Sequence, residues 1–410
     1  MSLFSKQRSS DTYGVLIDVG SASVLVAIVH SNMHEPHPNV VWSHREHAPI
    51  RNIESIEQVS KSVITALMNA AMELDTNGRK VLTQYNAKAK ITQIQSSISA
   101  PWTHTVTKNI NYTQDEPFVI SESLVDELIK TTEEKIAADL KTDGTLEKSG
   151  LHMITSATLD MLANGYRVTH PQDSKAKQFS LSRANVVAQK TIIDALSETT
   201  EKILPHAEHR KLSFILMSFA AMRDLLPSLY EIGLVDITYE ATEIGIVRDG
   251  SLQHSTHTSF GSFSLAREIA AVLDIPLAEA FGYIHHPEPL AFLATLTESK
   301  KTEIESVFEA YIDRLSALFN ETGDELTIPK TIALHADLKS EPFFLELVEK
   351  AAKRSTKTMP HVTLVTKEIL NQSFDNKATK AFFTHSSDTA LLLSAMFFHK
   401  HHDSTSFMYL

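Results

Sequence analysis

Short apolar runs with strand-like spacing alternate along the chain with longer runs at helical spacing, and the alternation repeats. Residues 13–17 and 24–29 are apolar runs joined by small residues, which predicts a β-hairpin, and residues 53–73 follow with apolar side chains at helical spacing. In the second half a hairpin is predicted at residues 233–238 and 243–248. The pattern therefore predicts an α/β fold built from two related halves.

The same spacing rules place the remaining elements around the two hairpins. Further strands are expected at residues 40–44, 91–98, 106–111, 151–159, 166–168, 178–187, 214–217, 331–334 and 361–366. Further helices are expected at residues 121–138, 191–203, 220–230, 264–273, 276–284, 302–319, 344–353 and 388–399, with an exposed loop at 141–149. No apolar run approaches the ~20 residues that a bilayer-spanning helix needs, which favours a cytoplasmic protein.

Composition narrows the classes of function. The chain carries 38 Lys and Arg against 50 Asp and Glu, a formal net charge of -12, whereas a nucleic-acid groove needs clustered cations, so no nucleic acid is expected as a partner. There is no Cys, which removes disulfide scaffolds, thiol catalysis and Cys-ligated metals. A length of 410 residues also exceeds one compact core and predicts two or three domains.

Each of the two predicted hairpins has an aspartate between its first strand and a turn of small or polar residues. The segments read VLIDVGSASVLVAIV around Asp18 and GLVDITYEATEIGIV around Asp236. Two such turns facing each other across a cleft can hold a polyphosphate, because turn N–H groups bind phosphate oxygens and an Asp reaches Mg²⁺ through water. Either aspartate alone is more simply a cap of its own turn, and it is the repetition that favours a site.

These motifs resemble those of the actin-like ATPase superfamily and, within it, the bacterial FtsA- and PilM-like proteins. The resemblance covers residues 13–399. DVGSASV at residues 18–24 is similar to the first phosphate motif, and DITYEATEIGIVRDGSL at residues 236–252 is similar to the second. SFGSFSLAREIAAVLDIPLAEA at residues 259–280 is similar to the segment that follows, and residues 332–348 take the place of the adenosine motif.

The resemblance implies an actin-like (ribonuclease H-like) fold of two lobes, with an SHS2-type subdomain inserted in the first. The implied boundaries are 13–90 for the start of the first lobe, 91–203 for the inserted subdomain and its link, 212–265 and 329–399 for the second lobe, 266–328 for its helical subdomain, and 400–410 for a tail. The implied ATP-binding residues are Asp18, Gly20, Ser21, Ser23, Asp236, Thr238 and Thr242, with Asp18 and Asp236 directed at Mg²⁺.

The chain departs from the family pattern in the second phosphate turn. Thr238, Tyr239 and Glu240 stand where the family has glycines, and Ala241 replaces a threonine, so side chains obstruct the approach of a phosphate. A carboxylate such as Glu240 about 4 Å from one phosphate charge would cost roughly 4 kcal/mol at an effective dielectric of about 20. Micromolar affinity corresponds to only about -8 kcal/mol, so one such repulsion weakens binding to about millimolar.

Two further segments depart from the pattern. The glycine run of the adenosine motif is replaced by the bulkier residues 335–338, which read HADL. The Glu-Pro pair that precedes the linking helix in FtsA-like chains is replaced by Met217 and Ser218. We therefore expect no catalytic residue, a pseudo-ATPase, and binding of ATP and Mg²⁺ that is weak or lost.

Histidines are abundant but not arranged like metal ligands. There are 20, of which His30, His34, His37, His44 and His47 cluster around one predicted hairpin. Their spacing is irregular and no HExxH pattern occurs, which favours solvated side chains. A second group at residues 399–403 would capture metal only adventitiously.

The resemblance implies a scaffold at the inner face of the cell membrane that acts in cell division or type IV pilus assembly. Its partner would be a membrane-associated protein, its own membrane contact would be indirect, and it could self-associate into filaments. The final residues, DSTSFMYL, are too short for an amphipathic membrane helix, which favours a hook for a partner groove or packing on the chain's own surface.

Two alternatives stay open. An ATPase or kinase on the same fold would need a working second phosphate turn and a general base, for which Asp18 is the only obvious candidate. A peptide-binding module that works without nucleotide would need a hydrophobic groove in the inserted subdomain.

Overall fold

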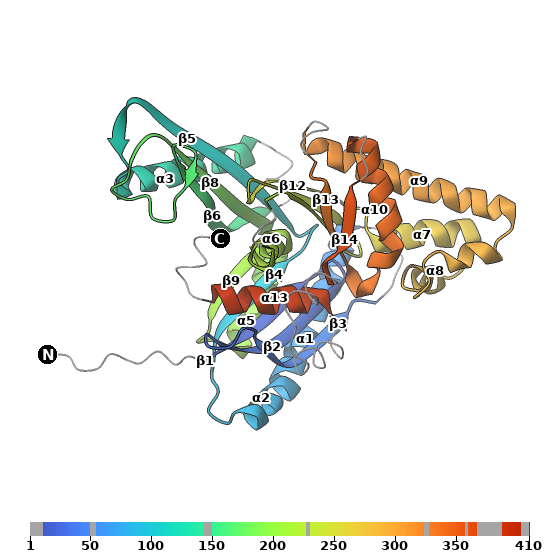
Figure 1. The fold of residues 1–410 in the computed structure, drawn as a ribbon. Coiled ribbons are helices and arrows are strands. Elements are labelled where there is room, and N and C mark those ends of the chain that lie inside the picture. The colour runs from blue at the N-terminus through green and yellow to red at the C-terminus, as the bar shows by residue number, and fades with distance from the viewer. Residues whose placement is uncertain are drawn as a thin grey trace.

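Three β-sheets organise the described part of the chain, two in the body of the molecule and one in a projecting subdomain (Figure 1). The computed structural model describes residues 11–49, 55–142, 150–226, 230–323, 328–356, 360–366, 388–402 and 410. Most of the predicted loop at 141–149 and the tail segment 403–409 lie outside these residues.

The two body sheets have the same topology. The first has the order β3-β2-β1-β4-β9, from β1 (Asp11–Val19), β2 (Ser23–Asn32), β3 (Asn39–His47), β4 (Ile91–Ile98) and β9 (Glu208–Ser213). The second has the order β12-β11-β10-β13-β14, from β10 (Ile232–Ile237), β11 (Thr242–Arg248), β12 (Ser251–Thr258), β13 (Thr331–Ala336) and β14 (His361–Leu364). In each sheet an antiparallel hairpin meander is extended by two parallel strands. The predicted repetition is therefore confirmed at the level of whole sheets.

The third sheet is inserted between β4 and β9 and is antiparallel. Its order is β5-β8-β6-β7, from β5 (Thr103–Val119), β6 (Leu151–Ala163), β7 (Tyr166–Arg167) and β8 (Lys175–Gln189), with α3 (Glu122–Thr142) packed on it. β5 continues well beyond the predicted strand because its polar outer half is held by pairing with β8 rather than by apolar alternation.

Two apolar helices lie between the body sheets. α6 (Phe214–Leu225) and α13 (Thr389–His401) pack against the inner faces of both sheets (Figure 1). In α13 every residue except Lys400 is buried, as expected of a helix that is apolar on all sides.

The strand predicted at residues 214–217 is wrong, because these residues form the first turn of α6. A short apolar run does not by itself distinguish a buried helix from a buried strand. The strand is β9 just before it, and the Ser213 side chain caps the helix by accepting from the Leu216 N–H at 3.3 Å.

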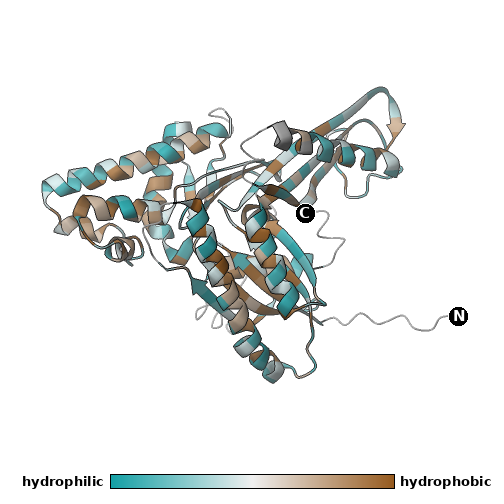
Figure 2. Cartoon of the chain, turned by 180° about the vertical axis from the view of Figure 1, so that it is seen from behind, coloured by the Kyte–Doolittle hydropathy of each residue, from teal (hydrophilic) through white to brown (hydrophobic). Residues whose placement is uncertain are grey.

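The remaining helices cover the outer faces. The first sheet is covered by α1 (Ile56–Glu73), the π-helical turn η1 (Leu74–Gly78), α2 (Arg79–Tyr85) and α5 (Lys190–Ile203). The second is covered by α7 (Ser262–Leu273), α8 (Leu277–Ile284), α9 (Glu298–Glu321) and α10 (Glu341–Thr356), with 3-10 turns η2 (Ala291–Thr295) and η3 (Asp337–Lys339). In Figure 2 the hydrophobic residues gather in the central strands and the inner sides of these helices. None of the described helices has the length and hydropathy that a bilayer-spanning segment requires.

Candidate functional site

The two predicted phosphate turns come from equivalent hairpins and touch each other directly. The first turn links β1 to β2, and the second links β10 to β11. The hydroxyl of Ser21 donates to Thr238 Oγ1 at 2.8 Å and accepts the N–H of Glu240 at 2.9 Å. Ser21 and Thr238 are both buried. The structure thus brings the two turns together, but Ser21 and Thr238 bond to each other across the place where a phosphate was expected.

Backbone donors that were expected to bind phosphate are used within the chain. The N–H of Gly20 donates to the Ser23 carbonyl at 2.9 Å, and the N–H of Thr238 donates to the Ala241 carbonyl at 2.9 Å. The Gly20 carbonyl also accepts from Trp102 Nε1 at 3.0 Å, which fixes the first turn. Together with the Glu240 N–H, three turn donors are therefore already satisfied without a ligand.

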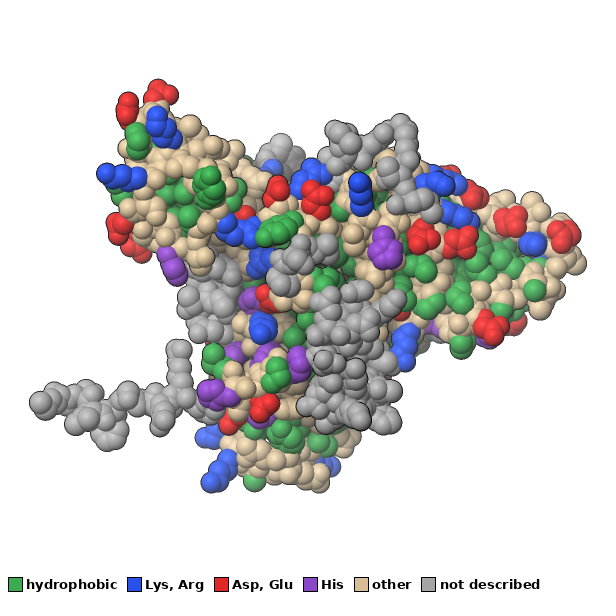
Figure 3. All heavy atoms as spheres, in the orientation of Figure 1, with side chains coloured by type: hydrophobic (Ala, Val, Ile, Leu, Met, Phe, Trp, Pro, Cys, Tyr) green, Lys and Arg blue, Asp and Glu red, His purple; other side chains and the backbone are tan. Residues whose placement is uncertain are grey.

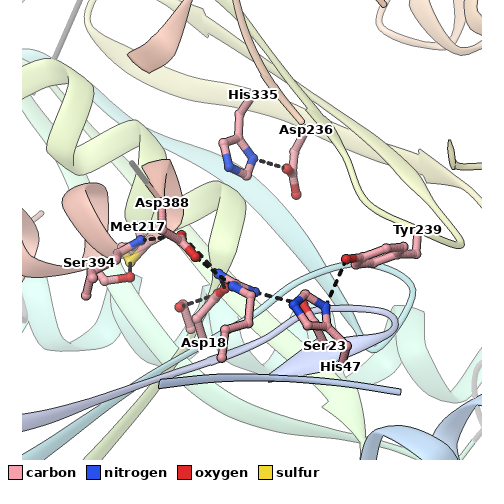
Figure 4. A network of polar contacts seen from close by, with 12 residues as sticks. Asp18, Ser23, His47, Met217, Asp236, Tyr239, His335, Asp388 and Ser394 are labelled. Carbon is pink, nitrogen blue, oxygen red and sulfur yellow. Dashed lines mark hydrogen bonds and ion pairs between the residues drawn. The ribbon is translucent and has the colours of Figure 1, made fainter. Parts of the chain in front are cut away.

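The carboxylate of Asp18 faces an arginine that the sequence did not point to (Figure 4). Arg45 on β3 donates through Nε to Asp388 at 2.6 Å and through Nη1 to Ser23 Oγ at 2.7 Å, and its Nη2 lies 3.5 Å from Asp18 Oδ2. Ser97 donates to the other Asp18 oxygen at 2.8 Å. Burial raises the pKa of Asp18, and Arg45 offsets only part of that effect. The guanidinium thus supplies the positive charge beside Asp18.

The second predicted Mg²⁺ ligand is paired as well. Asp236 Oδ1 lies 2.6 Å from Nδ1 of His335 on β13, and both side chains are buried (Figure 4). Burial lowers the pKa of His335, but Asp236 outweighs it and the pKa is raised to about 9, so His335 is protonated at neutral pH. The cavity that these two residues help to line is about 10 Å³, enough for roughly one water.

Tyr239 and Glu240, which replace two of the family glycines, have side-chain partners in both lobes. The Tyr239 ring packs on Phe263 with centroids 4.7 Å apart, and its hydroxyl lies 3.2 Å from His47 Nδ1. Arg267 on α7 donates to Glu240 through two nitrogens, one of them at 3.0 Å. Arg267 neutralises the Glu240 carboxylate. The repulsion of a phosphate that was expected from an unpaired Glu240 therefore does not apply.

Thr242 differs from the other predicted site residues in where its side chain is used. Its hydroxyl donates to the Phe260 carbonyl at 2.8 Å and lies 3.4 Å from the Tyr311 hydroxyl. It therefore ties β11 to the segment before α7 and to α9, within the second lobe.

The segment in the place of the adenosine motif keeps an unusual backbone. Leu338 and Lys339 adopt positive φ angles of 54° and 61°, the conformation that favours glycine. Asp337 before them is buried, and burial raises its pKa to about 7. Its Oδ2 has no hydrogen-bond partner among the described residues. This segment thus has the backbone conformation of a glycine turn, although its residues carry bulky side chains.

The position of the family Glu-Pro pair carries no acid. Met217 is fully buried in α6, and its sulfur accepts from Ser394 Oγ of α13 at 3.3 Å. The Ser218 hydroxyl is buried without a hydrogen-bond partner among the described residues. These two side chains supply no general base to activate a water.

Several histidines have side-chain partners, so the expectation that the histidines are solvated is wrong for them. Figure 3 shows histidines gathered around the first sheet and α13. His30 lies 2.9 Å from Asp11 Oδ1, and His399 lies 2.9 Å from Ser31 Oγ, whereas His34 is exposed. Within the described residues, no group of three or more His, Asp or Glu side chains is arranged to hold a metal ion.

The residues that sequence reasoning missed are the partners of the predicted ones. They are Arg45, Arg267, His335 as a cation, and Asp388. Arg45 lies just after the predicted strand 40–44 in the polar run SHREH, and nothing local connected it to Asp388 at the start of α13.

Several solved structures are similar in fold to this chain. No family model matches the sequence, and no curated protein matches it either. A solved structure of the PilM-PilN type IV pilus biogenesis complex matches 93% of this chain and 97% of its own, at 10% identity and a TM-score of 0.57. The ethanolamine utilization protein EutJ of Carboxydothermus hydrogenoformans matches 94% of this chain and 89% of its own, at 11% identity and a TM-score of 0.42. A Bacteroides thetaiotaomicron protein with an actin-like ATPase fold matches 88% and 95%, at 10% identity and a TM-score of 0.39.

The chain therefore has the predicted α/β actin-like fold, and its structure resembles that of the PilM-PilN complex over nearly its whole length. In this arrangement the residues do not fit a bound polyphosphate. The hydroxyls of Ser21 and Thr238 are in direct contact, and Arg45 and His335 already neutralise the two aspartates.

Proposed function

We propose that this chain is a protein-binding scaffold of PilM type that uses the actin-like fold without nucleotide turnover. The observation that carries the proposal is the direct contact between the two phosphate turns through Ser21, Thr238 and Glu240. A similar fold is found in a complex of PilM with a protein partner, PilN, which supports a function through protein contacts. The partner would belong to a membrane-associated pilus or envelope assembly machinery, with the scaffold on the inner side.

ATP binding would require this cleft to open at a cost. Ser21 would lose its contacts with Thr238 and Glu240, at about 1 kcal/mol for each hydrogen bond. Arg45 would also have to turn away from Asp388 or accept a phosphate in its place. These losses subtract from the -8 kcal/mol or so of a micromolar site, which supports ATP binding that is weak or absent.

Calorimetric titration with ATP and Mg²⁺ tests the nucleotide part of this proposal. We expect no saturable heat below about millimolar ATP and no release of phosphate. Micromolar binding with turnover would instead support an ATPase or kinase on the same fold. A double variant Ser21→Ala, Glu240→Gly serves as a comparison, because it removes the contact between the turns without touching Asp18 or Asp236.

A gene deletion tests the cellular part. Loss of surface pili with normal division would support the pilus assignment, whereas undivided cells with normal pili would assign the scaffold to cell division. A strain unchanged in both respects would contradict the proposal.

A further inference from the structure

A tyrosine, a histidine and an aspartate are hydrogen-bonded in series at one end of the first sheet. Tyr85 is the last residue of α2, His30 lies near the end of β2, and Asp11 begins β1. His30 Nδ1 lies 3.0 Å from the Tyr85 hydroxyl, and His30 Nε2 lies 2.9 Å from Asp11 Oδ1. The three side chains therefore follow the order of a nucleophile, a base and a group that orients the base.

The partners of the histidine fix which ring nitrogen carries the proton. An ionised Asp11 carboxylate accepts hydrogen bonds but donates none, so it receives the Nε2–H of the neutral ring. Nδ1 then keeps its lone pair and accepts the Tyr85 O–H. Asn32 Nδ2 donates to the same Asp11 oxygen at 2.8 Å, and the Tyr13 ring stacks on the imidazole with centroids 4.5 Å apart. The imidazole is thus held in the tautomer and the orientation that a general base needs.

Of the two side chains that would react, the tyrosine is the exposed one. Tyr85 is 48% exposed, whereas the His30 side chain is 13% exposed. A small reagent can therefore reach the tyrosine while the base stays largely shielded from water. Partial burial raises the pKa of Tyr85, so this phenol ionises less readily than a free one and depends on a neighbouring base to become a nucleophile.

We propose that Tyr85 is a site of covalent acylation, with His30 as its general base and Asp11 as the residue that positions the base. As the phenolic oxygen attacks the carbonyl carbon of an acyl donor, its proton moves to His30 Nδ1. A bond forms between that oxygen and the acyl carbon, and the bond from the acyl carbon to the leaving group breaks. His30 then passes the proton to the leaving group or to water.

The chemistry of the nucleophile defines the class of donor. The leaving group must be a weaker base than a phenolate, whose conjugate acid has a pKa of about 10, since otherwise the phenol itself would be expelled again. Alkoxides are stronger bases, so ordinary alkyl esters are excluded. The donor is therefore a small activated acyl compound, such as an aryl ester with an acidic phenol or an acyl phosphate.

Reaction of the full chain with p-nitrophenyl acetate tests the proposal. Release of p-nitrophenolate gives the rate, and peptide mapping by mass spectrometry locates the acetyl group. We expect Tyr85 to be acetylated about tenfold faster than Tyr166, which is more exposed, at 78%, and has no histidine hydrogen-bonded to it among the described residues. The test uses no nucleotide and no partner protein, so its failure would leave the scaffold proposal untouched.

Variants separate the role of the base from simple exposure. His30→Gln keeps a donor for Asp11 but has no base, so it should slow the acetylation of Tyr85 to the rate at Tyr166. Tyr85→Phe should abolish the fast release of p-nitrophenolate. Asp11→Asn should also slow the reaction, and Asp11→Glu should restore part of the loss. The rate at Tyr166 should stay the same in every variant, which shows that each one is folded.

The comparison within the parent chain is decisive even where a variant fails to fold. Equal rates at Tyr85 and Tyr166 in the parent would overturn the proposal. A folded His30→Gln variant that is acetylated at Tyr85 as fast as the parent would overturn it as well. So would an acetyl group on His30 with none on Tyr85, because the imidazole would then be the nucleophile.

Discussion

Arg45 joins Asp18 of the first lobe to Asp388 at the start of α13, and its side chain is only 12% exposed. Burial raises the pKa of Asp388, but the guanidinium outweighs that effect and holds the pKa below its usual range. Replacing Arg45 with Met leaves two largely buried carboxylates without a counter-ion. We expect a loss of about 3 kcal/mol in the free energy of unfolding at pH 7, measured by urea denaturation.

The exposed pair of Lys202 and Glu198 provides the matched control. The two side chains are 69% and 70% exposed, so Lys202→Met should cost no more than about 0.5 kcal/mol. Equal losses in the two variants would show that the Arg45 cluster contributes no more than a surface ion pair.

Glu243 is a buried acid opposite Asp236 in the β10–β11 pair. Burial raises its pKa to about 8, against 4.5 for an ordinary glutamate, although Ser255 donates to one oxygen at 2.8 Å. The folded chain therefore keeps this proton between pH 4.5 and about 8 while the unfolded chain releases it, so stability falls as pH rises through that window.

The Glu243→Gln variant removes this loss because its amide cannot ionise and still accepts from Ser255. We expect it to be more stable than the parent at pH 8 by up to about 4 kcal/mol and similar to it at pH 4, in denaturation curves at the two pH values. The exposed Glu305→Gln should show no such difference. A Glu243→Gln variant that is less stable at both pH values would contradict the protonated state.

At the scale of elements, α7 begins against the second phosphate turn. The N–H of Ser262 donates to the Thr238 carbonyl at 3.0 Å, and the N–H of Phe263 donates to the Tyr239 carbonyl at 2.8 Å. This approach requires glycine at 261, where a Cβ would meet the Thr238 oxygen at 2.2 Å and the Ala241 nitrogen at 2.7 Å. The helix and the turn are therefore positioned as one unit.

The Gly261→Ala variant should displace that unit. The clash is with backbone atoms that cannot rotate away, so we expect a loss of about 2 kcal/mol or more in thermal denaturation. Gly282→Ala in α8 is the control, because a Cβ there meets nothing within 4 Å and the change should stabilise the helix by up to about 1 kcal/mol. A neutral Gly261→Ala would mean that the turn yields easily.

At the scale of the whole molecule, the inserted subdomain contacts the second lobe through β5 and β12. Asn109 donates to Gln253 Oε1 at 2.9 Å, and the rings of His104 and His257 lie 5.7 Å apart. Burial lowers the pKa of both histidines, that of His257 to about 4, with like-charge repulsion from His104 as the second cause. Other titratable groups nearby include His254, whose charge acts on His104, Glu321, whose charge acts on His254, and Glu243, which is paired with His257 across β11 and β12.

This contact should weaken in acid. Between pH 6.5 and about 4 the unfolded chain binds protons that the folded His257 does not, so stability is complete above pH 6.5 and is lost as pH falls. His257→Phe should reduce that acid loss by about 2 kcal/mol, measured as the difference in unfolding free energy between pH 7 and pH 4.5. The exposed His361→Phe should leave it unchanged, and equal slopes in both variants would contradict the assignment.

Much of the fold could be predicted from local sequence patterns. Alternation and turn chemistry around Asp18 and Asp236 predicted both hairpins, and the repeated order predicted two related halves, which the structure shows as two sheets of one topology. The same reasoning failed at residues 214–217, where an apolar run fits a buried helix as well as a buried strand. It also missed the full length of β5, since pairing with β8 compensates for weak apolar alternation.

The sequence by itself determined that this chain has two related halves, each with an aspartate beside a turn, because spacing and turn residues act over a few positions. Only the tertiary structure decided what those aspartates face. Arg45, His335 and Arg267 come from strands and a helix distant in the sequence, and packing brings their charges to Asp18, Asp236 and Glu240. Electrostatic pairing depends on distances of a few ångströms in space, and no local pattern in the chain encodes them.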